Sequence, residues 1–229
     1  MLREKENILF ESWKKEISKD SGTVFVADGV VDENKWNTAS IKVLYLLKEV
    51  NGGDNEWDER DYLLHYNDKP EYIKTHSPTI DVLIKWQYGI INGNSVSWED
   101  MQKATANKVV QSELLSQICL VNCKKTAGGS LVDWNDFSAY IEKTVNILNL
   151  KEQLSYYSPN IVVCGGTAWF LNQIFEWKNT DWKQTSRGIA YCKKGNTIYI
   201  DFCHPNNRGP KNMIYYGLAD AVYEITNNI

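Results

Sequence analysis

The sequence has 229 residues, of which 43% are hydrophobic and 24% are charged. This is the composition of a folded globular protein, and it excludes an intrinsically disordered one. Its formal net charge of −4 argues against loose, non-specific binding of nucleic acid along the whole surface. A local basic patch is still compatible with this charge, since basic residues outnumber acidic ones from Lys183 to the end of the sequence.

The cysteines and the first residues indicate the compartment. None of the five cysteines forms a CxxC pair, and we interpret them as buried free thiols of a reducing compartment. Charged residues occupy the beginning of the sequence, where a signal peptide needs an apolar region, and no apolar run is long enough to cross a membrane. The sequence therefore predicts a cytoplasmic protein with no membrane partner, no metal and no cofactor.

Apolar periodicity and turn residues predict the following elements in chain order. The first half contains a helix over 1–19, a short strand or structured loop over 23–29, a strand over 42–47, a short helix over 59–66, and helices over 78–91 and 97–115. The second half contains a strand over 118–121, a helix over 133–157 with a break near Leu150, a strand over 161–164, a helix over 168–177, strands over 189–192 and 196–202, and a helix from Pro210.

Strands that alternate with helices at this spacing predict an α/β fold. We expect a three-layer α/β/α sandwich with a central, mostly parallel sheet of about four strands. The sequence contains no linker, internal repeat or low-complexity tract, which predicts one domain over residues 1–229. Residues 1–40 are expected to form a helix and a loop that pack on the core.

The end of the first predicted core strand is the first candidate site. The apolar run over 42–47 stops at Lys48 and Glu49, and Asn51, two glycines and an acidic, aromatic segment over 54–61 follow. Ligands of open α/β sheets bind just beyond the carboxyl ends of such strands. An ordinary strand-to-loop turn explains the same residues, since loops often contain glycine and charge.

Three further strand ends carry polar residues or glycines, and all four would meet at one edge of the sheet. Taken together, the four loops contain Lys48, Glu49 and Asn51; Asn122, Lys124 and Lys125; Gly165 and Thr167; and His204, Asn206, Asn207 and Arg208. Structural roles are the alternative: Asn122 closing a turn, the Gly pair at 165–166 allowing tight packing, and His204 filling space. We favour a functional role for His204 because His-Pro directly follows a strand and precedes Asn-Asn-Arg.

The chemistry of these residues suits the departure of a nucleobase from a sugar. The sequence has no nucleophile elbow and no Walker loop. A carboxylate or amide can position water, an Asn can read an amide-like edge, and a His can donate to a carbonyl. A hydrogen bond from the His would stabilise the leaving base anion, and a nearby carboxylate would stabilise an oxocarbenium-like sugar.

The order of these motifs resembles that of the uracil-DNA glycosylase superfamily. Lys48-Glu49-Val50-Asn51-Gly52 falls where the family has a motif of the type Gly-Glu-Ala-Pro-Gly, and Leu120-Val121-Asn122 resembles its Asn-bearing strand end. His204-Pro205-Asn206-Asn207-Arg208 resembles its His-Pro motif, which is the most specific part. The resemblance covers residues 42–228 and implies a uracil-DNA glycosylase-like fold and DNA as the partner, single-stranded or carrying a modified base.

The resemblance also implies roles for individual residues. Glu49 would position or activate the water, with Asn51 beside it, and His204 would stabilise the charge on the leaving base. Asn122 would read the flipped base and Trp57 or Tyr62 would stack on it, in a pocket completed by Lys48, Gly165 and Thr167. Arg208 would contact phosphate or fill the gap in the duplex, with Asn206, Asn207, Lys124 and Lys125 as further DNA contacts.

Lys48 and Asn51 stand where the family has Gly and Pro, so we expect the substrate to differ from uracil. Members of the superfamily that defend bacteria against phages remove bulky modified cytosines, and this chain is similar to them. Two alternatives from other functional classes are a non-catalytic module that binds a nucleotide or single-stranded nucleic acid, and a hydrolase of a small nucleotide-like metabolite. A catalytic variant would use Lys48 as an amine nucleophile.

Overall fold

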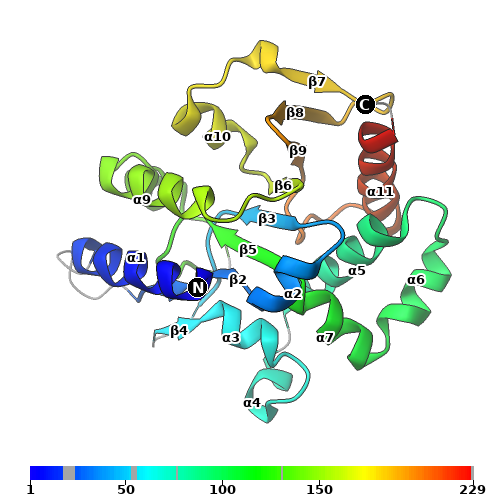
Figure 1. Cartoon of the computed structure of the whole chain (residues 1–229), viewed down its shortest axis with the longest axis horizontal. Coiled ribbons are helices and arrows are strands. Elements are labelled where there is room, and N and C mark those ends of the chain that lie inside the picture. The colour runs from blue at the N-terminus through cyan, green and yellow to red at the C-terminus, as the bar shows by residue number, and fades with distance from the viewer. Residues whose placement is uncertain (18–23, 53–55, 76, 130, 228–229) are drawn as a thin grey trace.

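The computed structural model describes residues 1–17, 24–52, 56–75, 77–129 and 131–227 (Figure 1). Within these residues, one sheet of seven strands has the order β2-β5-β3-β6-β9-β8-β7. The strands are β2 (Gly29–Val30), β3 (Val43–Leu47), β5 (Ile118–Asn122), β6 (Ile161–Gly165), β7 (Trp182–Gln184), β8 (Ala190–Lys194) and β9 (Thr197–Phe202). The predicted α/β class with a mostly parallel central sheet is thereby confirmed, but this sheet has seven strands and not about four, because antiparallel strands extend it at both edges.

The centre of the sheet consists of four parallel strands, β5, β3, β6 and β9. β3, β5 and β6 are buried along their whole length, as their continuous apolar runs predict. Antiparallel strands widen the sheet at both edges: β2 pairs with β5, while β8 and β7 extend it beyond β9. The chain leaves β3 towards β5 on one side and then returns past it to β6 on the other. This reversal of direction is where open α/β sheets bind ligands.

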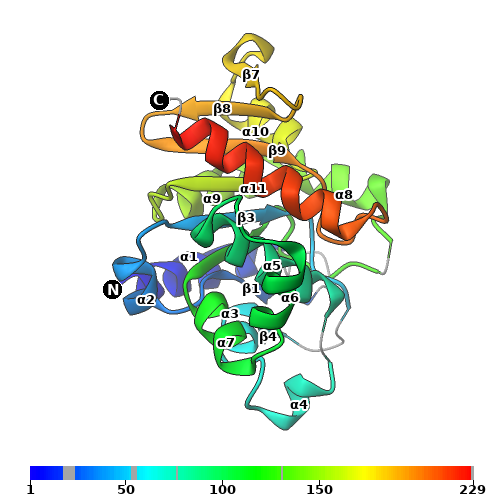
Figure 2. The ribbon, with the colours of Figure 1, turned by 90° about the vertical axis from the view of Figure 1, so that its right-hand side faces the viewer.

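Helices cover both faces of the sheet (Figures 1 and 2). One apolar cluster joins Tyr45 and Leu47 of β3 to α3 (Glu59–Leu64), α5 (Pro78–Asn92), α7 (Lys108–Ser116) and α11 (Lys211–Asn227). The other joins Leu44 and Leu46 to α1 (Leu2–Ile17), α2 (Glu33–Thr38), α8 (Trp134–Ile141), α9 (Thr144–Ser155) and α10 (Ala168–Phe175). Alternate residues of β3 thus face opposite layers. None of the helices in the described residues is both long and apolar enough to span a membrane.

Two long predicted helices are each divided in two. The helix expected over 97–115 is α6 (Trp98–Thr105) and α7, because the Asn107 side chain accepts a hydrogen bond from Val109 N at 2.9 Å and starts a new helix. The helix expected over 133–157 ends at Ile141 and restarts at Thr144, so the predicted break near Leu150 is wrong. The buried Asn146 stabilises this break by donating to Tyr140 O at 2.7 Å.

The first 40 residues pack against the sheet through short elements that the sequence only partly predicts. α1 contributes Phe10 and Trp13 to the second apolar cluster, and the region over 23–29 contains β1 (Val26–Ala27) and β2. β1 pairs in parallel with β4 (Trp57–Asp58), which precedes α3 and α4 (Pro70–Ile73). Gly29 has a φ of 134°, and a Cβ there would lie 2.1 Å from Glu6 Oε1. A larger residue at this position would separate α1 from the sheet.

Two glycines inside helices provide a test of the packing between α5 and α11. A Cβ on Gly89 would lie 2.7 Å from the buried Tyr215 ring, so Gly89→Ala should lower the free energy of unfolding by about 1–3 kcal/mol. Gly217→Ala is the matched control, since its Cβ would meet no atom closer than 3.8 Å. That variant should gain stability, by up to about 1 kcal/mol, from better helix propensity. Urea unfolding of both variants measures this, and equal effects would contradict the packing.

Candidate functional site

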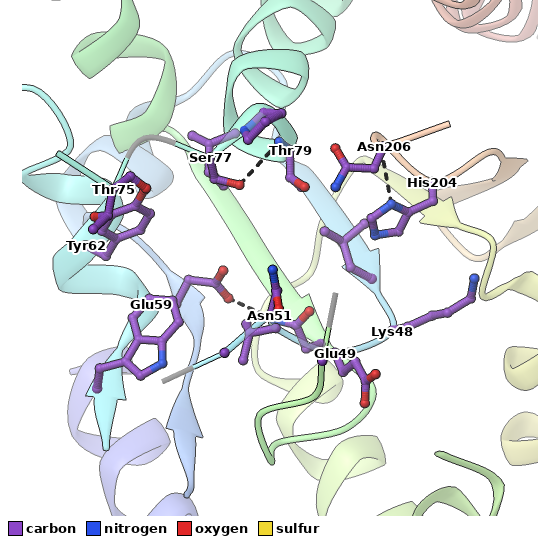
Figure 3. Close-up of a pocket in the computed structure, with 18 of the residues that line it drawn as sticks. Lys48, Glu49, Asn51, Glu59, Tyr62, Thr75, Ser77, Thr79, His204 and Asn206 are labelled. Atoms are coloured by element: carbon purple, nitrogen blue, oxygen red, sulfur yellow. Dashed lines mark hydrogen bonds between the residues drawn. The ribbon is translucent and has the colours of Figure 1, made fainter. Parts of the chain in front are cut away.

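A cavity of about 690 Å³ lies at the carboxyl ends of β3, β5 and β9 (Figure 3). Its volume is within the range of small-molecule sites, about 300–1,000 Å³. Eight residues singled out in the sequence line it: Lys48, Glu49, Asn51, Trp57, Tyr62, Asn122, His204 and Asn206. Asn122 and His204, which are 82 residues apart in the sequence, therefore line the same cavity.

Gly165 and Thr167 have structural roles outside the cavity wall. A Cβ on Gly165 would lie 2.5 Å from Leu47 Cδ2, so a glycine is needed there for close packing of β6 on β3. The buried Thr167 hydroxyl donates a hydrogen bond to Leu46 O at 2.8 Å. The packing alternative therefore describes Gly165 better than contact with a substrate, and Thr167 has a structural hydrogen bond in place of the predicted one to a substrate.

Glu49 is held in an ion pair at the side of the cavity. Its Oε2 accepts a hydrogen bond from Lys124 Nζ at 2.7 Å, and its carboxyl group lies against Gly128. Figure 3 shows the Glu49 carboxylate turned away from the middle of the cavity. Asn51, in contrast, is exposed at the cavity rim, where Gly52 N donates to Gly128 O at 2.9 Å and holds the loop. Residues 53–55 of the acidic segment lie outside the described residues.

Lys124 and Lys125 do not have the position expected of DNA contacts. Lys124 is 2% exposed and donates to both Glu49 and Asp136, while Lys125 is fully buried and donates to Asp28. A buried ammonium group needs a carboxylate partner, and each lysine has one. Because neither amine reaches the surface, the prediction that they contact DNA is corrected.

His204 is positioned as a neutral hydrogen-bond donor. Its Nδ1 accepts a hydrogen bond from Asn206 N at 3.1 Å, so the proton of the neutral ring is on Nε2. Burial lowers the His204 pKa to about 4, with help from the positive charges of Lys48 and Lys211. At neutral pH the ring is therefore uncharged and donates through Nε2–H. Asn206, Asn207 and Arg208 are exposed in the loop that follows it.

Lys48 lies on one side of the cavity, and two aromatic residues form the wall on the opposite side. Burial lowers the pKa of Lys48, and its Nζ lies 4.9 Å from the centre of the exposed Trp134 ring. On the opposite side, Trp57 and Tyr62 pack edge to face at 5.6 Å. The Tyr62 hydroxyl donates to Thr75 O at 2.8 Å, which fixes this ring as a rigid wall.

Asp28 is a buried residue in the region over 23–29 that the sequence predicts as a short strand or structured loop. Its carboxylate accepts hydrogen bonds from Asn122 N at 2.8 Å, from Gln153 Nε2 at 2.9 Å and from Lys125 Nζ. The Asn122 side-chain amide also points towards it, at 3.4 Å. Asp28 therefore fixes the position of Asn122 from beneath. No local pattern marks it, since an Asp before a Gly is ordinary in turns.

Glu59 is a second residue that sequence reasoning missed. It is the first residue of α3, it is 7% exposed, and its Oε2 accepts a hydrogen bond from Asn122 Nδ2 at 2.8 Å. Burial and the nearby Asp28 raise the Glu59 pKa to about 8, so the carboxyl group is mostly protonated at neutral pH. The acidic segment was noted in the sequence, but which of its carboxylates is buried depends on the fold.

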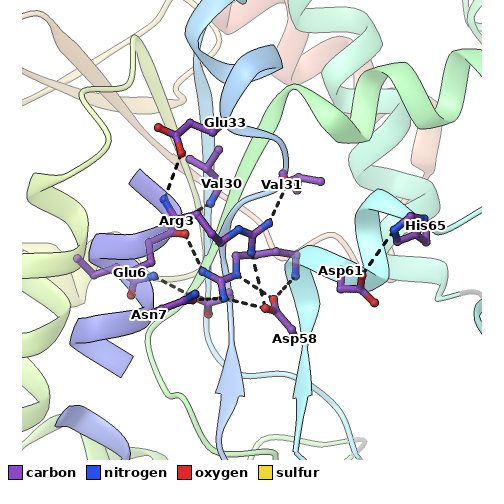
Figure 4. Close-up of polar contacts among 12 residues, drawn as sticks. Arg3, Glu6, Asn7, Val30, Val31, Glu33, Asp58, Asp61 and His65 are labelled. Carbon is purple, nitrogen blue, oxygen red and sulfur yellow. Dashed lines mark hydrogen bonds and ion pairs between the residues drawn. The ribbon is translucent and has the colours of Figure 1, made fainter. Parts of the chain in front are cut away.

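The other described carboxylates of the acidic segment are paired locally. Arg60 is buried and donates to Glu6 of α1 and to Asp58 of β4, both at 2.7 Å; Figure 4 shows these two carboxylates and the polar contacts around them. Asp61 accepts from Lys69 and from the Tyr72 hydroxyl, both at 2.7 Å. The contact between Arg60 and Glu6 anchors α3 to α1. All of these pairs reduce the negative charge that the segment presents beside the cavity.

The protonation state of His204 is testable by NMR. The His204 ring should titrate with a midpoint near pH 4, because burial and two lysines disfavour the charged form. Its signals among the three histidines of the chain are assigned by their loss in His204→Ala. A midpoint near 6.5 would contradict this environment.

The lowered pKa of His204 also affects stability, because the unfolded state binds the proton more tightly than the folded state. The free energy of unfolding should therefore fall as the pH falls from about 6.5 towards 4.

The buried Lys125 ion pair should dominate stability at the base of the cavity. Lys125→Met leaves the Asp28 charge buried without its cation and should lower the free energy of unfolding by about 3–5 kcal/mol. Lys35→Met is the matched control, because the ion pair between Lys35 and Glu113 is exposed and such pairs contribute little. Denaturant unfolding measures both, and a mild effect of Lys125→Met would show that the pair does not have this role.

The cavity combines a neutral His donor, an Asn–Glu pair and aromatic walls. Within the described part of the chain, no group of three or more His, Cys, Asp or Glu side chains is arranged to hold a metal ion. Comparisons with protein-family models, with curated proteins and with solved structures gave no match to this chain.

Proposed function

We propose that this protein hydrolyses the N-glycosidic bond of a nucleobase in DNA, with the base bound in the cavity beneath His204. The observation that carries the proposal is that His204 and Asn122, from the ends of β9 and β5, line one cavity. The neutral Nε2–H of His204 is a donor suited to a base that gains negative charge. The resemblance to the uracil-DNA glycosylase superfamily places an Asn and a His-Pro motif in these roles.

In this reaction the bond between C1′ and the base nitrogen breaks, and its electron pair stays with the base. The hydrogen bond from His204 stabilises the resulting anion, while the sugar becomes an oxocarbenium-like cation. Water adds to C1′ and loses a proton to solvent. Asn51 at the cavity rim positions that water. Glu49 on the same loop is turned aside in its ion pair with Lys124 and takes no direct part in this step.

DNA as the substrate is supported by the surroundings of the cavity. A base in a duplex has to leave the stack before it can enter a pocket of this kind. The exposed loop with Asn206, Asn207 and Arg208 follows His204 and is placed to contact the strand that carries the base. The exposed Trp134, with Lys48 over its ring, offers a stacking surface beside the entrance.

A panel of single- and double-stranded oligonucleotides with normal and modified bases tests the proposal, scored as alkali-sensitive sites. The wild-type protein should release at least one of these bases, and His204→Ala should reduce the rate by about 100-fold or more. His65→Ala is the control, since His65 is paired with Asp68 away from the cavity and its loss should leave the rate unchanged. Undiminished release by His204→Ala, or no release by the wild-type protein, would contradict the proposal.

A second candidate function is binding of a nucleotide or single-stranded nucleic acid without catalysis. The observation that favours it is the ion pair between Glu49 and Lys124, which occupies the carboxylate assigned to water activation. This function predicts salt-dependent binding of single-stranded DNA and no abasic product from any member of the panel. The same oligonucleotides, tested by fluorescence anisotropy at two salt concentrations, distinguish the two functions.

A further inference from the structure

The Asn122 side-chain amide has its N–H groups occupied within the protein, and only its oxygen is available to a ligand. Its Nδ2 donates to Glu59 Oε2 at 2.8 Å and lies 3.4 Å from Asp28 Oδ2, so both amide protons have a carboxyl partner. No hydrogen bond to Asn122 Oδ1 is found from the described residues. Asn122 can therefore accept a hydrogen bond from a ligand but has no proton left to donate.

Glu59 can supply the hydrogen-bond donor that Asn122 lacks. Figure 3 shows its carboxyl group extending into the cavity, between Tyr62 on one side and Asn51 on the other. One oxygen, Oε2, accepts from Asn122, and no hydrogen bond to Oε1 is found within the described residues. A carboxylic acid in this position accepts from the Asn with one oxygen and donates from the other into the cavity.

The charges around Glu59 favour that neutral acid. Asp28, beneath Asn122, and Asp58, the residue before Glu59, both disfavour a second negative charge, while Lys125 favours it from behind Asp28. The hydrogen bond from Asn122 also favours the ionised form. Burial is the largest effect, and the resulting Glu59 pKa of about 8 leaves the group protonated at neutral pH.

We propose that Glu59 is a specificity residue that donates a hydrogen bond from its neutral carboxyl group to the base, while Asn122 Oδ1 accepts one from it. This inference rests on the proposed function, since it assumes that the cavity receives a base. The pair matches a base edge on which an N–H donor lies beside an acceptor. Each base has such a Watson–Crick edge, for example N4–H beside N3 in cytosine and N6–H beside N1 in adenine. Any modification on the preferred base then has to lie away from that edge.

The inference predicts how ligand binding depends on pH. Above about pH 8 the ionised Glu59 cannot donate, and it repels the acceptor atom of the base. Between pH 7 and pH 9 the protonated fraction falls about tenfold, so affinity should fall by the same factor. In Glu59→Gln the amide donates and accepts without titrating, so affinity should be equal at both pH values.

The experiment measures binding of 1-methylcytosine and of 9-methyladenine to the full chain by NMR titration at pH 7 and pH 9. The wild-type protein should bind about tenfold more weakly at pH 9, and Glu59→Gln should not. Glu71→Gln is the matched control, because Glu71 is an exposed carboxylate that lines the same cavity. This variant should keep the tenfold change. Near-UV circular dichroism confirms that each variant is folded.

Equal wild-type affinity at both pH values, a persistent tenfold change in Glu59→Gln, or no binding of either base at pH 7 would each overturn the inference. If Glu59→Gln does not fold, the pH dependence of binding by the wild-type protein decides. A midpoint near pH 8 that Glu71→Gln retains supports the role of Glu59. The absence of any midpoint between pH 7 and pH 9 overturns it. Base release that depends on His204, together with pH-independent binding, would leave the proposed function standing without this role.

Discussion

The carboxylate of Asp28 is the constraint on which the cavity depends. It is fully buried, and a buried charge without partners would cost several kcal/mol. Lys125, Gln153 and the backbone of Asn122 satisfy it from the loop after β5, from α9 and from the end of β5. These donors can meet only when the N-terminal strands, the sheet and α9 are all in place. The position of Asn122 is therefore fixed by folding itself, before any ligand is present.

A second buried pair extends this arrangement to α3 and explains why very short strands are well defined. Arg60, next to Glu59, donates to Glu6 of α1, and the Tyr157 hydroxyl also donates to Glu6 at 2.8 Å. β1 and β2 have two residues each and make few ladder hydrogen bonds of their own. The ionic contacts on either side hold them instead. α1 thus supports the wall that carries Glu59 although it lies behind the cavity.

Sequence patterns predicted β3, β5 and β6 well because each is a short apolar run that ends in polar residues or glycine. Asn122 and His204 were found for the same reason, as polar residues at strand ends. Asp28 and Glu59 were missed because burial of a charge depends on distant partners: Asp28 and Lys125 are 97 residues apart, and Glu59 and Asn122 are 63 apart. Lys124 and Lys125 were expected to contact DNA, which requires exposed side chains, but each is buried against a carboxylate. The local sequence around either partner therefore does not predict such a pair.

The fixed tautomer of His204 has a consequence for which bases could leave. A ring that donates from Nε2 and resists protonation stabilises negative charge but has no acidic proton to transfer. In the proposed reaction the base departs as an anion, so the acidity of its own N–H group governs the barrier. Electron-withdrawing substituents on the base would then speed its release, in proportion to their effect on that acidity. The choice of base would then depend on how readily the base leaves as an anion as well as on how it fits the cavity.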